Sequence, residues 1–523
     1  MKRQNKILIG LAIVCVILIV IDGMFCYYST QNKNVLKAGE HLFPEGLKIE
    51  GGETLEIKPG AVLKMGKDTI IDIRGRIVAR GTAKKPIIFT ADDYWRGVKI
   101  QGELETPDSE SFWPMLSEKD KDKREEFFRE LEKANIFEYV NFSKTSTESR
   151  ELAVANKWKS TIEAYDTSLV VKNSSFQDIL HIGAVLTQRS YVLLSDNLFK
   201  SETLHKVTNF TDDSVLLIYN NTIDLNRKEN ARCADGFWVN NSTALIYKNK
   251  IKGTADDAID SDTSHVLVMA NVIESPKDDG VDIDNEGFAY VIDNKINGVN
   301  ENAILISDKS KAVVMNNEMT NSESGLTVRD GARVGASDNV IEKNQTGVLV
   351  FQDIPCVLKK KDYEHLIDTI SKLSEEEVKG IKSVMIESPE DFVAQINSYY
   401  REKEGYYNLV DVYTDRISSL KVLKEAFKFV DLFSFEHNSL KDNAFCQSLE
   451  NTLYLANSSV KDNLENVGLY HEYNVNFEAI NTDTALEKEN LEAVSNKDFV
   501  CEITDSMNLG SVEASISAII SEL

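Results

Sequence analysis

Short stretches of alternating polar and apolar residues, each closed by turn residues, fill the chain between residues 163 and 355. An asparagine recurs just before an apolar pair, at intervals of 24, 24, 28, 22, 23, 23 and 22 residues. Such intervals are too short for a helix-turn-helix repeat, but they fit one coil of a β-solenoid. We therefore predict that one corner of each coil carries a hydrogen-bonded ladder of stacked asparagines: Asn173, Asn197, Asn221, Asn249, Asn271, Asn294, Asn317 and Asn339.

The segment before residue 142 carries a related pattern. Residues 55–63 alternate polar and apolar side chains around the turn at Pro59 and Gly60, and residues 70–82 and 85–90 contain further short strands. We expect these strands to form coils that precede the asparagine repeat.

Two features of these coils resemble a known family. The proline-glycine turn at 59–60 and the stretch Gly-Thr-Ala-x-x-Pro-Ile-x-Phe-Thr at 81–90 resemble the opening coils of bacterial right-handed β-helix surface proteins. Together with the asparagine repeat, they make residues from about 40 to 355 similar to the pectate-lyase-like right-handed parallel β-helix superfamily. The resemblance implies an all-β solenoid, built as a single-stranded, right-handed parallel β-helix.

Other segments interrupt or follow this pattern. Within a β-helix spanning 31–358, the charged stretch at about 103–135 predicts a helical insertion. Residues 359–430 predict a second helical insertion, and the coil pattern resumes at 431–484. Residues 485–523 end in an amphipathic helix, which we expect to cap the open end of the solenoid and hide its last unpaired strand.

Residues 1–30 differ in kind from the rest of the chain. Lys2, Arg3 and Lys6 precede an uninterrupted apolar run at residues 7–21. This pattern predicts an uncleaved signal-anchor that crosses the membrane once with its N-terminus in the cytoplasm, or a signal peptide that is removed. Both interpretations place the bulk of the chain outside the cytoplasm, anchored to the cell membrane in the first and secreted in the second.

Two nearly identical acidic segments, 256–262 and 278–284, begin 22 residues apart. If they stack, their outward side chains lie about 4.8 Å apart between strands and about 6.6 Å apart along a strand. Four carboxylates that close repel one another and need a cation, a proton or a substrate. The candidate catalytic aspartates are therefore Asp260, Asp262, Asp282 and Asp284, and the candidate Ca²⁺ ligands are these four with Asp257 and Asp279 from the preceding turns.

Residues on the neighbouring coils flank this acidic square. Trp238 could stack on a sugar ring, with Asn240 and Ser307 as further substrate-binding residues. Arg329 lies about two coils, roughly 10 Å, away, where it could hold a uronate carboxylate through two hydrogen bonds and take part in catalysis. Aligned by the asparagines, the outward pairs from coil to coil are Phe210/Asp212, Trp238/Asn240, Asp260/Asp262, Asp282/Asp284, Leu305/Ser307, Thr327/Arg329 and Leu349/Phe351.

Three functions fit this pattern. In the first, which pectate lyases use, Ca²⁺ neutralises an acidic polysaccharide and acidifies the proton beside its carboxylate. In the second, two carboxylates hydrolyse a glycosidic bond as acid and base. Glycoside hydrolases of this fold also place a histidine beside their aspartates, whereas His265 begins a different strand, so we favour lyase or epimerase chemistry. In the third, the carboxylates bind structural Ca²⁺ in a non-catalytic adhesion or assembly scaffold.

The charge of the chain narrows its partners. The formal net charge is −25, which argues against nucleic acid because phosphate binding needs basic surfaces. We expect an acidic or neutral polysaccharide as partner, the membrane through the N-terminal segment, and a protein partner at 359–430 if the chain is a scaffold. The sequence contains no nucleotide-binding, nucleophile-elbow or zinc motif, and we expect no organic cofactor.

Overall fold

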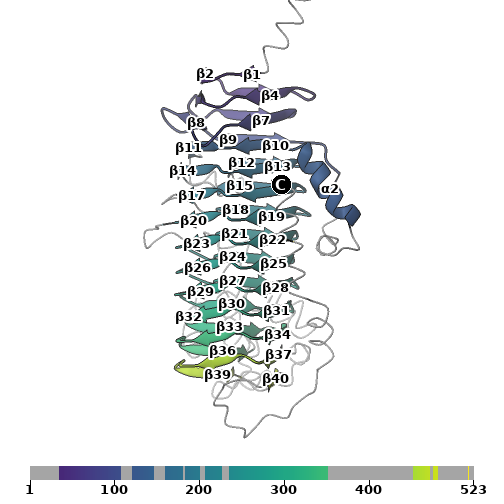
Figure 1. The fold of residues 1–523 in the computed structure, drawn as a ribbon, viewed down its shortest axis with the longest axis vertical. Coiled ribbons are helices and arrows are strands. Elements are labelled where there is room, and N and C mark those ends of the chain that lie inside the picture. Colours follow the sequence, from purple (N-terminus) through teal and green to yellow (C-terminus); the bar gives the residue numbers. More distant parts are fainter. Residues whose placement is uncertain are drawn as a thin grey trace, which may run out of the picture. The chain divides into compact units, whose positions relative to one another are not determined.

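The structure is a computed structural model that describes residues 35–105, 107, 121–146, 160–180, 183–200, 207–225, 235–351, 451–470, 475–480 and 516. Most of these residues form short parallel strands (Figure 1). The chain divides into a first unit, which contains residues 1–107 and 125–204, and a second unit, which contains residues 108–124 and 205–523. Three parallel sheets, called A, B and C, run through each unit, and successive strands belong to A, B and C in turn.

In the first unit, each strand lies beside the strand that follows one coil later. Sheet A consists of β1 (Val35–Leu36), β4 (Thr54–Ile57), β7 (Arg76–Arg80), β10 (Asn135–Glu138), β13 (Ser168–Lys172) and β16 (Tyr191–Ser195). Sheet B consists of β2 (Gly39–Phe43), β5 (Ala61–Met65), β8 (Ile87–Ala91), β11 (Val140–Ser146), β14 (Ser175–Leu180) and β17 (Leu198–Lys200). Sheet C consists of β3 (Leu47–Ile49), β6 (Ile70–Ile73), β9 (Gly97–Gln101), β12 (Ser160–Tyr165) and β15 (Gly183–Gln188).

The second unit repeats the same order. Sheet A consists of β19 (Val215–Tyr219), β22 (Thr243–Tyr247), β25 (His265–Met269), β28 (Phe288–Ile292), β31 (Lys311–Met315), β34 (Arg333–Ser337), β37 (Asn451–Ala456) and β40 (Val475–Ile480). Sheet B consists of β20 (Thr222–Asp224), β23 (Lys250–Lys252), β26 (Val272–Glu274), β29 (Lys295–Asn297), β32 (Glu318–Thr320), β35 (Val340–Glu342) and β38 (Ser459–Lys461). Sheet C consists of β18 (Thr208–Thr211), β21 (Phe237–Asn240), β24 (Ile259–Asp262), β27 (Val281–Asp284), β30 (Asn302–Ile306), β33 (Ser324–Arg329), β36 (Thr346–Phe351) and β39 (Glu465–Tyr470).

This arrangement confirms the predicted all-β solenoid of parallel coils. Alternate residues of each strand point inward, and identical positions on successive coils stack. In sheet B of the first unit, Phe142, Phe176 and Phe199 stack with ring centroids 5.0 Å apart. All three side chains are fully buried, so the core is a column of like residues rather than a closed globular interior.

The asparagine ladder is present in the second unit. Each ladder residue donates to the next, as Asn271 does to Oδ1 of Asn294 from its backbone N–H and its Nδ2, both at 3.0 Å. The prediction is wrong at Asn173, which takes a left-handed conformation (φ 50°). Ser174 holds the ladder position instead and donates its N–H to Oδ1 of Asn197 (2.9 Å).

One helix, α2 (Lys121–Glu132), lies on the outside of the described coils. It falls between β9 of sheet C and β10 of sheet A. Phe127 packs edge-on against Tyr191 of β16, with centroids 5.9 Å apart. The guanidinium of Arg76 donates to the carbonyls of Glu132 (2.8 Å) and Ala134 (3.0 Å). The charged insertion therefore covers the outer face of sheet A in the first unit.

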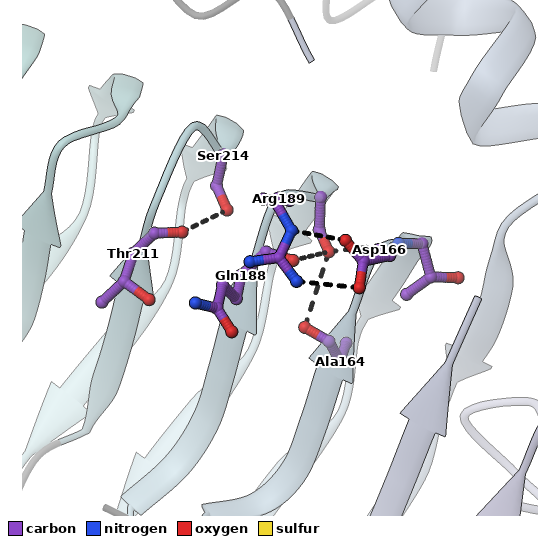
Figure 2. A network of polar contacts seen from close by, with 8 residues as sticks. Ala164, Asp166, Gln188, Arg189, Thr211 and Ser214 are labelled. Atoms are coloured by element: carbon purple, nitrogen blue, oxygen red, sulfur yellow. Dashed lines mark hydrogen bonds and ion pairs between the residues drawn. The ribbon is translucent and has the colours of Figure 1, made fainter. Parts of the chain in front are cut away.

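The corner between sheets C and A in the first unit is closed by an ion pair (Figure 2). Asp166 and Arg189 follow neighbouring sheet C strands, and both have left-handed φ values of 50° and 48°. The Arg189 guanidinium donates from Nε (2.5 Å) and Nη2 (2.9 Å) to the two carboxylate oxygens of Asp166. This bidentate contact joins consecutive coils.

Several expected segments lie outside the described residues. They are the signal-anchor at 1–30, the helical insertion at 359–430, residues 431–450 of the resumed coils, and the terminal cap at 485–523 except Ile516. Beyond the insertion, β37 pairs with β34 and β38 with β35. In the described part of the chain, no helix is long and apolar enough to span a membrane.

Candidate acidic site on sheet C

The structure brings the four central aspartates together on the outer face of sheet C. β24 and β27 pair in parallel so that Asp260 lies beside Asp282 and Asp262 beside Asp284. The alternating residues Ile259, Val281 and Ile283 are fully buried in the core. Because side chains alternate along a strand, the apolar residues that fix the register also force the carboxylates onto the same outer face.

The β21 strand adds two donors to this face. Trp238 lies beside Asp260, and Asn240 lies beside Asp262. The indole Nε1–H of Trp238 donates to Oδ2 of Asp262 (2.7 Å), and Nδ2 of Asn240 donates to the same oxygen (3.3 Å). Trp238 therefore holds Asp262 in place, a role that the sequence did not reveal.

Both carboxylate oxygens of Asp262 accept hydrogen bonds. Oδ1 accepts a hydrogen bond from Nδ2 of Asn285 (2.7 Å). Burial by itself would raise the pKa of Asp262, but hydrogen bonds from Asp284 and from the three neutral donors outweigh it, and the pKa lies below its usual value. Asp262 is therefore a carboxylate that stays ionised.

The pKa of Asp284 is shifted in the opposite direction. Burial raises the pKa of its carboxyl well above the usual value, and the hydrogen bond to Asp262 and the charges of Asp262, Asp282 and Asp260 raise it further. Its Oδ1 is buried without a hydrogen-bond partner among the described residues. Of the two carboxyl groups, Asp284 is therefore the one that binds a proton more readily.

Asp282 and Arg329 form the next part of the face. Burial, followed by the charge of Asp279, raises the pKa of Asp282 well above its usual value, while Arg329 opposes the shift. The Arg329 side chain is 18% exposed, and its Nε lies 3.8 Å from Oδ2 of the buried Asp330. Arg329 thus acts electrostatically on the acidic face.

The turns that enter these strands hold a second group of carboxylates. Oδ1 of Asp257 accepts the N–H of Asp279 (2.8 Å). Oδ1 of Asp279 in turn accepts the N–H (2.7 Å) and Nδ2 (2.8 Å) of Asn302. Burial is the main cause that raises the pKa of Asp279 to about 6 and that of Asp278 to about 10. These aspartates form part of a ladder that joins coils, so Asp257 and Asp279 have a structural task besides any metal.

At two positions the structure differs from the predicted outer face of sheet C. Asn209, not Phe210, lies beside Trp238, and Phe210 is fully buried. The alignment slipped by one residue because the long coil between β18 and β21 hides the register. Ser307 is only 1% exposed, so its hydroxyl is not accessible to a polymer on the surface.

The carboxylates meet the elementary requirement for a hard cation. Oxygens of Asp260, Asp262 and Asp284 lie within 4.8 Å of one another, a separation that an ion about 2.3–2.6 Å from each ligand can bridge. The buried Oδ1 of Asp284 without a partner also fits a cation at this position. Three further groups meet the same distance limit: Asp235/Asp257/Asp260, Asp256/Asp257/Asp278 and Asp278/Asp279/Glu301.

Sequence reasoning missed four acidic residues of these groups, namely Asp235, Asp256, Asp278 and Glu301, as metal candidates. Asp256 and Asp278 stand in the repeated segments themselves. Their pairing across the coil was therefore available from the 22-residue repeat. Glu301 occupies the position of Asp278 on the next coil, where its N–H donates to the Asp278 carbonyl, so it too could have been aligned. Asn285 stands where the preceding coil has Thr263, and only the fold shows its contact with Asp262.

One family model and several solved structures are similar to parts of this chain. Residues 160–289 and 279–365 match the family model described as right handed beta helix region. The periplasmic alginate epimerase AlgG is similar over 86% of this chain and 78% of its own, with 9% identity and a TM-score of 0.42. No curated protein matches the sequence.

Two further solved structures are similar over shorter stretches. The surface protein and adhesin PfbA of Streptococcus pneumoniae shares 11% identity over 61% of this chain and 88% of its own, with a TM-score of 0.21. An exopolygalacturonase from Thermotoga maritima shares 12% identity over 60% of this chain and 83% of its own, with a TM-score of 0.19.

Proposed function

The coils of this chain form a right-handed parallel β-helix, and we propose that the outer face of sheet C binds or processes an extracellular polysaccharide. The observation that carries the proposal is the adjacent Asp262–Asp284 pair, in which hydrogen bonds lower the pKa of Asp262 and burial raises that of Asp284. Opposite pKa shifts in adjacent carboxyl groups are the arrangement from which an acid and a base can act on one substrate.

The proposed substrate is a polymer that contains uronic acid. Abstraction of the proton beside a uronate carboxylate requires a base and a group that neutralises the carboxylate. Asp262 would be the base and Asp284 the acid, while Arg329 would bind the carboxylate of the sugar. Trp238 is partly exposed, and its ring face could stack on a sugar while its N–H holds Asp262.

Lyase or epimerase chemistry suits this pair better than inverting hydrolysis. Inverting enzymes keep their two carboxyl groups about 6.5–9.5 Å apart to admit a water molecule, whereas Asp262 and Asp284 hydrogen-bond to each other. His265 lies on β25 of sheet A, so it does not supply the histidine that hydrolases of this fold place beside their aspartates.

We include Ca²⁺ in the proposal as the ion that Asp260, Asp262 and Asp284 would hold. A bound Ca²⁺ would neutralise the substrate carboxylate and lower the pKa of the adjacent carbon acid. Because a cation displaces the proton of a carboxyl ligand, Asp284 would serve as the acid only while the ion is absent and as a ligand when it is bound, and Arg329 and Trp238 would orient the sugar. Export through residues 1–30 would bring the site to an extracytoplasmic polymer.

The test is an activity screen on the full chain in detergent, against uronic-acid polymers, with Ca²⁺ or with chelator. Lyase activity produces an unsaturated sugar that is followed by its ultraviolet absorbance, and epimerase activity exchanges the substrate proton with solvent deuterium. We expect one of these signals, and we expect Asp284→Asn to remove it while Asp224→Asn on sheet B retains it. Equal activity in both variants would contradict the assignment of Asp284 as the acid.

A further inference from the structure

Two cations lie side by side at the start of sheet A strands in the second unit. Lys311 is the first residue of β31 and Arg333 is the first residue of β34, and the parallel register makes them direct neighbours. Neighbouring strands lie about 4.8 Å apart, and both side chains are exposed. Like charges at such neighbouring positions repel each other and destabilise the sheet, so this pairing costs free energy unless an anion binds it.

No residue that the structure describes supplies this anion. The row continues with Phe288 on the strand before Lys311 and with Thr452 on the strand after Arg333, and both residue types are uncharged. Neither Lys311 nor Arg333 forms an ion pair with a described residue. The two cations are therefore not placed here to neutralise a neighbouring carboxylate of the coils.

Sheet B of the same unit shows the contrasting arrangement. There, exposed lysines have a glutamate at the same position of an adjacent strand. The three pairs, with their N–O distances, are Lys252–Glu274 (3.5 Å), Lys295–Glu318 (3.4 Å) and Lys461–Glu342 (3.7 Å). The stacking of the coils thus compensates charge on sheet B, but it leaves the charge of the Lys311–Arg333 pair uncompensated.

The pair lies beside the acidic face of sheet C. Arg329, the last residue of β33, precedes Arg333 by four residues, a span of at most about 14 Å. Lys309 lies next to the turn between the two arginines, because its N–H donates to the carbonyl of Asp330 (2.9 Å). The Lys309 ammonium is 59% exposed and lies 3.8 Å from Glu286, and an exposed ion pair of this kind is weak. We call Lys309, Lys311 and Arg333 the corner patch.

A polyuronate needs such a patch to approach the acidic face. The chain has a formal net charge of −25, and the carboxyl groups of sheet C repel an anionic polymer. Asp308 adds to this repulsion on the sheet C side, because its charge acts on Asp282. A cluster of cations at the adjacent corner provides local attraction that offsets the repulsion.

We propose that the corner patch binds carboxylates of a uronate polymer that continues from the acidic site across the corner onto sheet A. This inference rests on the proposed function, because it concerns further sugars of the same polymer. The three cations would hold carboxylates through charge-assisted hydrogen bonds. Phe288, which is half-buried beside Lys311, would offer apolar surface to a sugar ring. A short oligomer at the acidic site would not reach the patch.

Calorimetry with oligomers of two lengths tests the patch on the full-length protein. The probes are dimers and decamers of galacturonate and of mannuronate. We expect Lys311→Gln/Arg333→Gln to weaken decamer binding by about fivefold or more and to leave dimer binding unchanged. Lys252→Gln/Lys295→Gln on sheet B removes the same charge and is the matched control, which should bind both probes as the wild type does.

The outcomes distinguish this proposal from the proposed function when Asp262→Asn/Asp284→Asn is titrated alongside. Weaker decamer binding in both the acidic and the corner variant supports both proposals. Weaker binding in the corner variant alone supports the patch and contradicts the acidic site. Unchanged binding in the corner variant, an equal loss in the sheet B control, or an equal loss for dimers would each overturn the patch. No binding of any probe by the wild type would overturn both proposals.

Thermal unfolding at low salt provides an independent check that does not need a ligand. Because Lys311→Gln/Arg333→Gln removes a repulsion between neighbouring strands, its melting temperature should equal or exceed that of the wild type. Added sulfate should raise the melting temperature of the wild type more than that of the variant, since only the wild type retains the cations. A lower melting temperature in the variant would show that the protein itself already neutralises the pair, and it would overturn the proposal.

Discussion

Asp262 and Asp284 occupy the same position on neighbouring strands of sheet C and have pKa values shifted in opposite directions. The parallel register of β24 and β27 puts them side by side. Asp262 also accepts hydrogen bonds from three neutral donors, Trp238, Asn240 and Asn285. The repeat that duplicated an acidic segment thus produced two unequal carboxyl groups. Their inequality comes from the residues around them, since the aspartates themselves are equivalent in the repeat.

Trp238→Phe should distinguish the two proposed roles of the indole, which are stacking on a sugar and donating its N–H to Asp262. The substitution keeps an aromatic face but removes the N–H that donates to Asp262 at 2.7 Å. We expect polymer affinity to change by less than about threefold, and turnover to fall by roughly tenfold to a hundredfold because a hydrogen bond to a charged group contributes about 1.5–3 kcal/mol.

Steady-state kinetics on the substrate found in the screen, with calorimetry for affinity, check this prediction. Trp238→Ala is the comparison and should lose affinity as well as turnover, because it removes the stacking face. If Trp238→Phe and Trp238→Ala behave alike in both measurements, the indole N–H has no separate role.

The Asp278 carboxyl should make the folded protein less stable as pH rises. Burial, together with the charges of Asp279, Glu301 and Asp256, raises the pKa of Asp278 to about 10 from 3.8. The unfolded chain releases this proton near pH 4, and the folded chain retains it, so the free energy of unfolding decreases between about pH 4 and pH 10.

Asp278→Asn should therefore flatten the pH dependence and stabilise the protein at pH 8 by on the order of 1–3 kcal/mol. Urea unfolding at several pH values between 5 and 8, in the presence of chelator, gives the measurement. Asp224→Asn, on sheet B, is the matched control. Parallel pH profiles for the wild type and Asp278→Asn would show that this carboxyl ionises in the folded state as it does in the unfolded chain.

Asn294→Ala should be strongly destabilising because Asn294 lies inside the ladder. Its Oδ1 accepts the N–H and Nδ2 of Asn271, and its Nδ2 donates to the carbonyl of Val268 (2.9 Å) and to Asn317 (2.9 Å). The alanine leaves buried backbone and amide groups without partners, at a cost of about 2–4 kcal/mol.

Chemical denaturation checks the ladder substitution against Asn297→Ala. Asn297 is an exposed residue on sheet B, so its loss should cost less than about 0.5 kcal/mol. Similar losses in both variants would mean that the buried ladder contributes no more than a surface asparagine.

The sequence permitted prediction of the coils because each coil repeats the same chemistry at one corner. Asn249, Asn271 and Asn294 could be aligned without a structure, and their spacing fixed the register of the acidic segments. The same reasoning failed at Phe210, where a coil of different length shifted the outward face by one residue. Periodicity locates a residue only while the coil length is constant.

The character of the site was less accessible to sequence reasoning. Stacking predicted that Asp262 and Asp284 would be neighbours, but not that Asn285 would hydrogen-bond to Asp262. The equivalent position on the preceding coil holds Thr263, so the repeat gives no signal for an asparagine contact there. The sequence also did not show that Leu267 is buried. Alternation along the strand assigns Leu267, which lies beside Tyr290 on sheet A, to the outer face, but its side chain is 0% exposed.

Calorimetric titration of a defined oligouronate into the full-length protein tests the central claim most directly. We expect saturable binding that falls at least tenfold in the Asp262→Asn/Asp284→Asn double variant and is unchanged in Asp224→Asn. Titrations with Ca²⁺ and with chelator separate the ion from the sugar. Equal binding by the double variant and the wild type would contradict the claim that the outer face of sheet C holds the polysaccharide, and so would the absence of binding by the wild type to any uronate in the screen.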